Sequence, residues 1–180
     1  MTTSTHEPVM ELLRAAIDPA SHRTDALSPA DLPTGRIIAA TAHADADDQG
    51  MERVSLMAAG IAMAAVGLTA EIAGRSGQST DALLDSLAQA ARTRGDDEFP
   101  LAVEVIRGMF SDGAADGVEI LGRTFAHDEA DFLTLLLNLA HYCGTSIMAL
   151  ETQFDTPAEQ TLSDLESALR SFAEGKDPSD

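Results

Sequence analysis

The chain has 180 residues, 44% of them hydrophobic, so it is long enough for one globular domain and too apolar for wholesale disorder. Thirty Asp and Glu residues against eleven Lys and Arg give a net charge of −19. This charge argues against direct binding of nucleic acid and against docking on an anionic membrane, because both need clustered basic residues.

The composition predicts an all-α protein. There is no Trp, a single Tyr and only six Phe, and runs of β-branched residues are rare. The one cysteine, Cys143, excludes an internal disulfide, and its apolar neighbours favour a buried structural thiol over a reactive one. The first residues show no signal-peptide pattern, so we expect a cytoplasmic protein. Lys176 is the only lysine, which is typical of a GC-rich genome, and we expect a bacterial source.

Apolar spacing and capping residues predict a compact bundle of seven or eight helices. In chain order the predicted helices are Pro8–Asp18, Gly35–Ala46, Met51–Gly74, Asp81–Arg94, Phe99–Phe110, Asp116–Phe125, Asp128–Phe154 and a last helix that starts at Pro157. A proline-containing loop over 20–34 follows the first of them. Ser79 or Thr80 is expected to cap the fourth helix and Thr156 the last one.

The helix Met51–Gly74 carries no charge between Val54 and Ala70. Seventeen uncharged residues are at the lower limit for a membrane span, and many of them are Ala and Gly, which favour insertion weakly. We therefore expect a buried central helix rather than a membrane span.

Three short segments recur in the same order in the two halves of the chain. Residues 11–17 resemble 104–110, the pattern A-H-x-x-A-D occurs at 42–47 and 126–131, and residues 85–92 resemble 163–170. These matches predict a tandem duplication within one domain that spans 1–180, with a first repeat at 7–95 and a second at 99–175. Two unrelated helical halves of similar composition are the alternative.

A duplicated helical unit is expected to pack about a pseudo-two-fold axis, with the two long helices crossing at the centre. Gly67 and Gly144 are the expected crossing point, because the backbones of two helices approach closely where side chains are absent. A half of the chain alone cannot bury a long helix that is apolar nearly all round.

The repeated pattern places His43 four residues before Asp47, and His127 four residues before Asp131. On a continuous helix each pair shares a face, and symmetry would bring the pairs together. Two imidazoles and two carboxylates suit a divalent metal such as Zn, Mn or Fe, or a histidine general base oriented by an aspartate. Helix capping and surface pairing by the same acids are the competing interpretation, and a pH-sensing pair is a third.

A second candidate lies inside the long helix Asp128–Phe154. Asn138, His141 and Thr145, with Glu129 or Asp131, follow helical spacing and predict a polar stripe that lines a small ligand pocket. A hydrogen-bonded core histidine is the alternative for His141.

No phosphate-binding loop, dinucleotide fingerprint, nucleophile elbow or paired-cysteine motif occurs in the sequence. We therefore expect a non-enzymatic helical protein without a cofactor. It would bind a protein partner, with a basic surface as the complement of its acidic charge, and form a homodimer. The alternative is a small helical metal- or ligand-binding protein or enzyme that uses His43, Asp47, His127, Asp131 or His141.

Overall fold

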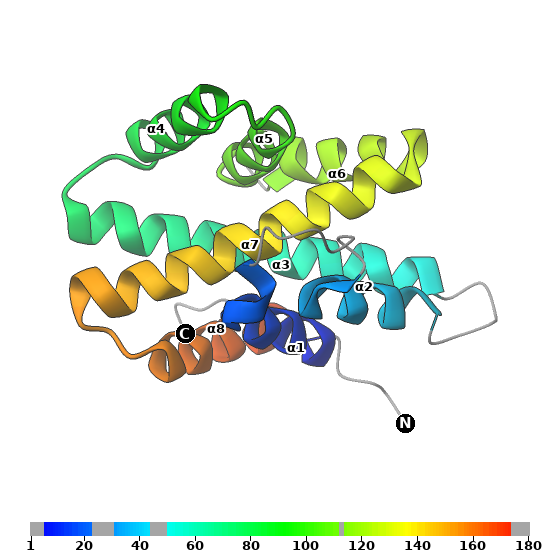
Figure 1. Cartoon of the computed structure of the whole chain (residues 1–180), viewed down its shortest axis with the longest axis horizontal. Coiled ribbons are helices and arrows are strands. Elements are labelled where there is room, and N and C mark those ends of the chain that lie inside the picture. The colour runs from blue at the N-terminus through cyan, green and yellow to red at the C-terminus, as the bar shows by residue number, and fades with distance from the viewer. Residues whose placement is uncertain (1–5, 23–30, 44–49, 112–113, 174–180) are drawn as a thin grey trace.

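The computed structural model describes residues 6–22, 31–43, 50–111 and 114–173, and every regular element in this part of the chain is helical (Figure 1). The elements are α1 (Glu7–Ala16), the 3₁₀ turn η1 (Pro19–His22), α2 (Pro33–His43), α3 (Gly50–Ser76), α4 (Thr80–Thr93), α5 (Phe99–Met109), α6 (Ala115–His127), α7 (Glu129–Phe154) and α8 (Ala158–Ala173). The predicted all-α fold and the predicted number of helices are confirmed.

The helices form three layers (Figure 1). The long helices α3 and α7 cross in the middle, with α4, α5 and α6 on one side and α1, α2 and α8 on the other. The last helix of the chain therefore lies in the same layer as the first. Two exposed ion pairs join the helices within the outer layers: Arg14 lies 3.7 Å from Glu166, and Arg107 lies 2.6 Å from Asp85.

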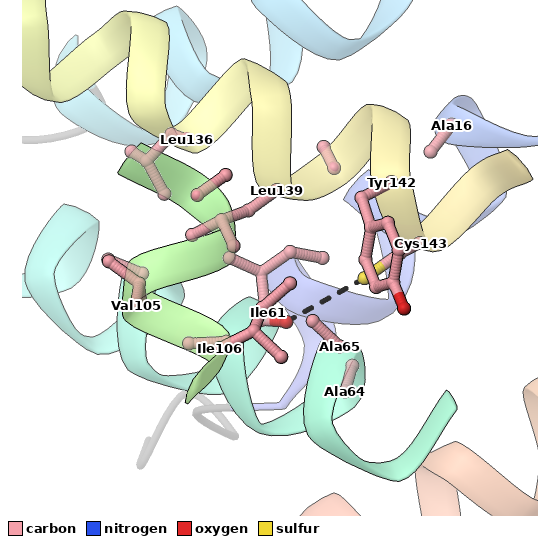
Figure 2. Close-up of a cluster of buried hydrophobic side chains, with 14 of the residues drawn as sticks. Ala16, Ile61, Ala64, Ala65, Val105, Ile106, Leu136, Leu139, Tyr142 and Cys143 are labelled. Carbon is pink, nitrogen blue, oxygen red and sulfur yellow. Dashed lines mark hydrogen bonds between the residues drawn. The ribbon is translucent and has the colours of Figure 1, made fainter. Parts of the chain in front are cut away.

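The core is built where α3 and α7 meet α1 and α5. Ile61, Ile106, Leu136 and Leu139 are fully buried in it, and Figure 2 shows these side chains packed between the helices. Burying a side chain of this size stabilises a fold by about 1.5–3 kcal/mol relative to leaving it in water. The long helices are therefore held mainly by apolar packing, as their composition indicates.

Small residues let α1 approach both long helices. A Cβ atom added at Gly144 would lie 2.7 Å from the carbonyl carbon of Ala16, and one at Gly60 would lie 2.6 Å from a methyl group of Val9. A Cβ at Gly67 would have only Leu165 of α8 within 4 Å. The prediction that α3 and α7 meet at Gly67 and Gly144 is therefore wrong, because other helices occupy the space beside both glycines.

Several predicted helix ends are found close to their expected positions. The hydroxyl of Ser79 caps α4 by accepting a hydrogen bond from the backbone N–H of Ala82 at 3.2 Å. At the start of α8 the expected cap differs: the hydroxyl of Thr156 donates back to the carbonyl of Phe154, and the carbonyl of Pro157 accepts the first helical bond from Thr161.

Two helices, Arg53–Ser76 and Glu129–Phe154, are long and apolar enough to cross a membrane by length and composition. In the most apolar window of each, 50% and 56% of the residues are buried inside the structure. The core helix of a globular protein passes the same test, so this property does not distinguish the two settings.

Candidate functional site

A cleft of about 560 Å³ lies where α4 and α5 face the second half of α7. This volume falls within the range of small-molecule sites. Its lining combines aromatic, aliphatic and polar side chains: Ile72, Leu83, Leu87, Arg94, Asp96, Phe99, Asn138, His141, Tyr142, Thr145, Ser146, Ala149 and Gln153.

One wall of the cleft is a stripe along α7. Asn138, Tyr142, Thr145, Ala149 and Gln153 recur every three or four residues, so they lie on one face of the helix. At a rise of 1.5 Å per residue this stripe extends over roughly 22 Å. The cleft is therefore elongated along the axis of α7.

The opposite wall comes from α4 and the turn that follows it. Leu83, Leu87 and Arg94 lie along α4 at helical spacing. Gly95 then adopts a positive φ of 74°, which ends the helix and turns the chain toward α5. The carboxylate of Asp96 accepts hydrogen bonds from the backbone N–H groups of Glu98 at 3.2 Å and Phe99 at 3.0 Å. This turn therefore fixes the start of α5 beside the cleft.

Two aromatic rings form one end of the cleft. The centroids of Phe99 and Tyr142 lie 6.3 Å apart with the rings tilted by 50°. The hydroxyl of Thr69 donates to the carbonyl of Ala65 at 2.6 Å, so the Tyr142 hydroxyl donates to Thr69 across their 2.7 Å contact. Burial raises the pKa of Tyr142, and its hydrogen bonds with Thr69 and Ser146 only partly offset this effect. Tyr142 is therefore a neutral, fixed phenol at physiological pH.

Asn138 brings an unsatisfied polar group to the same end. Its side-chain Nδ2 is buried and has no acceptor among the residues that the structure describes. A buried donor without a partner costs about 1–3 kcal/mol, and native structures contain few of them. If the Asn138 side chain rotates toward the cleft, an oxygen atom of a bound ligand would accept from this amide and remove the cost of the unsatisfied donor.

Arg94 supplies a positive charge at this end. Its side chain is exposed, and it makes no ion pair within the described ranges of the chain. Arg94 also lines a larger hollow of about 730 Å³. All of the other lining residues of this hollow belong to α4, which Arg94 directly follows. A single helix surface cannot enclose a ligand, so the cleft against α7 is the stronger candidate.

The structure divides the predicted histidine–aspartate pairs. His127 ends α6 and Asp131 lies in the first turn of α7, with extended backbone at Asp128 between them, so they do not share one helix face. The carboxylate of Asp128 caps α7 by accepting from the N–H groups of Ala130 and Asp131. Capping by an acid of this segment, one of the three interpretations predicted, is thus observed.

The pair His43 and Asp47 lies largely outside the described residues. His43 is the last residue of α2, and its side chain and all of Asp47 lie outside the described residues. Among the side chains that are described, no group of three or more His, Cys, Asp and Glu residues is arranged to hold a metal ion.

The predicted polar stripe fits the cleft better. Asn138, His141 and Thr145 all line it, whereas Glu129 and Asp131 do not. The sequence interpretation missed the contributions of Phe99, Arg94 and Asp96. Helical periodicity identifies a polar face on α7, but it does not reveal which helix lies opposite that face.

Cys143 is fully buried beside the cleft wall, with its Sγ atom 3.7 Å from the carbonyl oxygen of Ile61 (Figure 2). Burial raises the pKa of its thiol, so the reactive thiolate is suppressed in the folded state. We expect iodoacetamide to leave Cys143 unmodified in the native protein between pH 7 and about 9, and to label it fully in urea. Mass spectrometry checks this, and rapid native labelling would contradict the burial.

Comparison of the chain with models of protein families, with curated proteins and with solved structures found no match.

Proposed function

We propose that this protein binds a small molecule in the cleft between α4, α5 and α7. The observation that carries this proposal is the Nδ2 of Asn138, which has no acceptor among the described residues and belongs to a lining residue of the cleft. The absence of catalytic motifs from the sequence favours a binding role over an enzymatic one. Of the functions expected from the sequence, ligand binding through a site that includes His141 is the one that the geometry of the cleft supports best.

We also propose that the chain arose by tandem duplication and that its halves pack about a pseudo-two-fold axis. The ends of α3 and α7, Ser76 and Phe154, are 78 residues apart, and so are the starts of α4 and α8, Thr80 and Ala158. The same separation relates most buried positions of α3 to buried positions of α7, as in the pairs Val54–Phe132, Met57–Leu135, Ile61–Leu139 and Ala65–Cys143.

The packing of the helices supports the same proposal. α1 packs on α7 and α8, and its counterpart α5 packs on α3 and α4. Arg14 of α1 and Arg107 of α5, which match in the sequence repeat, each pair with an acid on that neighbouring helix. Most contacts between helices in one half of the chain therefore have a counterpart in the other half.

Under this correspondence the cleft has a smaller counterpart of about 210 Å³, a groove between α3 and α8. A separation of 78 residues relates seven lining positions of the two sites. With the residue of the cleft given first and that of the groove second, the related positions are Ile72 and Leu150, Leu83 and Thr161, Leu87 and Leu165, Thr145 and Gly67, Ser146 and Leu68, Ala149 and Glu71, and Gln153 and Arg75.

Two side chains that differ between the sites account for the larger volume of the cleft. In the smaller groove, Glu71 and Arg75 form an ion pair along α3. In the cleft, Ala149 and Gln153 occupy the related positions on α7, so a short and a neutral side chain replace the pair. Divergence of a duplicated groove would thus leave one small copy and one larger copy able to admit a ligand.

Transferring the ion pair into the cleft tests the proposed function. The double variant Ala149→Glu, Gln153→Arg places the same i, i+4 pair on α7 without changing the net charge. We expect it to fill the cleft and to weaken binding of the fluorescent probe 1-anilinonaphthalene-8-sulfonate, an aromatic anion, by at least about tenfold, a loss of roughly 1.4 kcal/mol. Fluorescence titration of the folded protein measures this affinity.

The matched control is Met148→Glu, Thr152→Arg, which adds an equivalent pair on an exposed part of α7 outside the cleft. This control should bind the probe as the unaltered protein does, and circular dichroism should report equal helicity for all three proteins. Equal affinity in both double variants would rule out the cleft as the binding site.

Binding to a basic protein partner, homodimer formation and a cytoplasmic location stay predictions that depend on the composition and charge of the chain.

A further inference from the structure

We propose that the ligand of the cleft is an elongated amphiphile, with a carboxylate head at the end formed by Arg94 and Asn138 and an apolar tail that runs along α4 and α7. This inference rests on the proposed ligand-binding function and adds the chemical class of the ligand and its direction in the site.

The two ends of the cleft differ in chemistry. Arg94 lies two residues before Asp96, whose carboxylate accepts a hydrogen bond from the N–H of Phe99. The Phe99 ring in turn packs against the ring of Tyr142, which follows His141 in the chain. Arg94, His141 and Asn138 therefore belong to one end. At the other end α3 and α7 finish together, since Arg75 donates to the carbonyl of Phe154 at 3.5 Å.

This second end is mostly apolar. Ile72, Leu83, Leu87 and Ala149 line it, and Gln153, near the end of α7, is the polar side chain beside them. Between Asn138 and Ala149 the α7 wall extends over roughly 16 Å at 1.5 Å per residue. A compact polar molecule would leave this part of the cleft unfilled, whereas a medium-length alkyl chain matches its length and would contact Ile72, Leu83 and Leu87.

The head end contains hydrogen-bond donors to which a ligand could supply an acceptor. Among the described residues, the Nδ2 of Asn138 has no acceptor and Arg94 has no acid in an ion pair with it. The one carboxylate of the lining, Asp96, already uses an oxygen to accept from two backbone N–H groups. A carboxylate head would accept from both Arg94 and Asn138, and charge-assisted hydrogen bonds of this kind are the stronger ones.

Three probes with one tail and different heads test the assignment: dodecanoate, dodecanol and dodecyltrimethylammonium, each titrated below its micelle concentration by isothermal calorimetry. We expect dodecanoate to bind most tightly to the unaltered protein. Arg94→Gln should weaken dodecanoate at least about tenfold and change dodecanol less than about twofold.

The matched control is Arg92→Gln, which removes the same charge from the last turn of α4 at an exposed residue that does not line the cleft. It should leave the dodecanoate affinity within about twofold of the unaltered protein. An equal effect of both substitutions would show that only net charge matters and would overturn the assigned head site.

Asn138→Leu provides a second measurement. Removal of an unsatisfied buried donor should raise the midpoint of thermal unfolding of the ligand-free protein, while the dodecanoate affinity falls. A purely structural asparagine would give lower thermal stability and unchanged affinity, which would overturn its role at the head.

The outcomes separate this inference from the proposed function. Tightest binding of dodecyltrimethylammonium, or equal binding of all three probes, would overturn the carboxylate head and leave the cleft as a ligand site. If no probe bound and the ion-pair variant of the cleft bound the fluorescent probe normally, the proposed function itself would fail.

Discussion

Replacing Gly144 with alanine is expected to destabilise the protein by about 3 kcal/mol, because overpacking where a backbone is in contact is costly. The added methyl group would lie against the carbonyl group and the Cβ of Ala16, at the end of α1. A backbone carbonyl cannot move aside as a flexible side chain does, so α1 has to shift away from α7. Urea unfolding followed by circular dichroism measures the change in the free energy of unfolding.

The same substitution at Gly122 is the matched control. Gly122 lies inside α6, and a Cβ added there has nothing within 4 Å. Gly122→Ala should stabilise the protein by about 0.5–1 kcal/mol, since alanine favours the helix and nothing opposes it. Destabilisation of similar size in both variants would contradict the assigned contact between α1 and α7.

Separating the halves of the chain is expected to abolish cooperative unfolding. In fragments 1–95 and 99–180, α1 loses α7 and α8, while α5 loses α3 and α4. Each fragment would then expose the core face of a long helix, which a unit of this size cannot cover by itself. Thermal melts of each fragment should be broad and weakly helical.

Mixing the two fragments should restore a sharp transition, because the lost contacts are non-covalent. The control is the full chain cleaved between residues 95 and 99 after folding, which should keep its helicity. A fragment 1–95 that unfolds cooperatively as a monomer would contradict the interdependence of the halves and would indicate two separate domains.

The helices could be predicted from the sequence because their signals are local. Proline in the first turns of α1 and α5, the Ser79 cap and the breaker Gly95 each act within a few residues. The predicted boundaries therefore differ from the observed ones by only a few residues. The join between α6 and α7 is predicted within two residues, and the structure places it at the single extended residue Asp128.

The contacts between helices were less predictable than the helices themselves. Gly144 was identified as a site of close approach, but the approaching element is α1 and not α3. The polar stripe of Asn138, His141 and Thr145 was identified as a pocket wall, while the opposing wall of α4 was not. Periodicity reports which face of a helix is polar or small, and only the tertiary arrangement decides what meets that face.

The position of α8 beside α1 has a consequence for synthesis on the ribosome. α1 packs against its neighbours α2 and α3, and also against α7 and α8, which follow it by more than 100 residues. Part of its apolar side, with Leu12 and Leu13 fully buried in the folded protein, therefore lacks its partner until α7 has been synthesised. Contacts between segments so far apart in the sequence form late, so we expect the core around α1 to be completed only after α7 and α8 have left the ribosome.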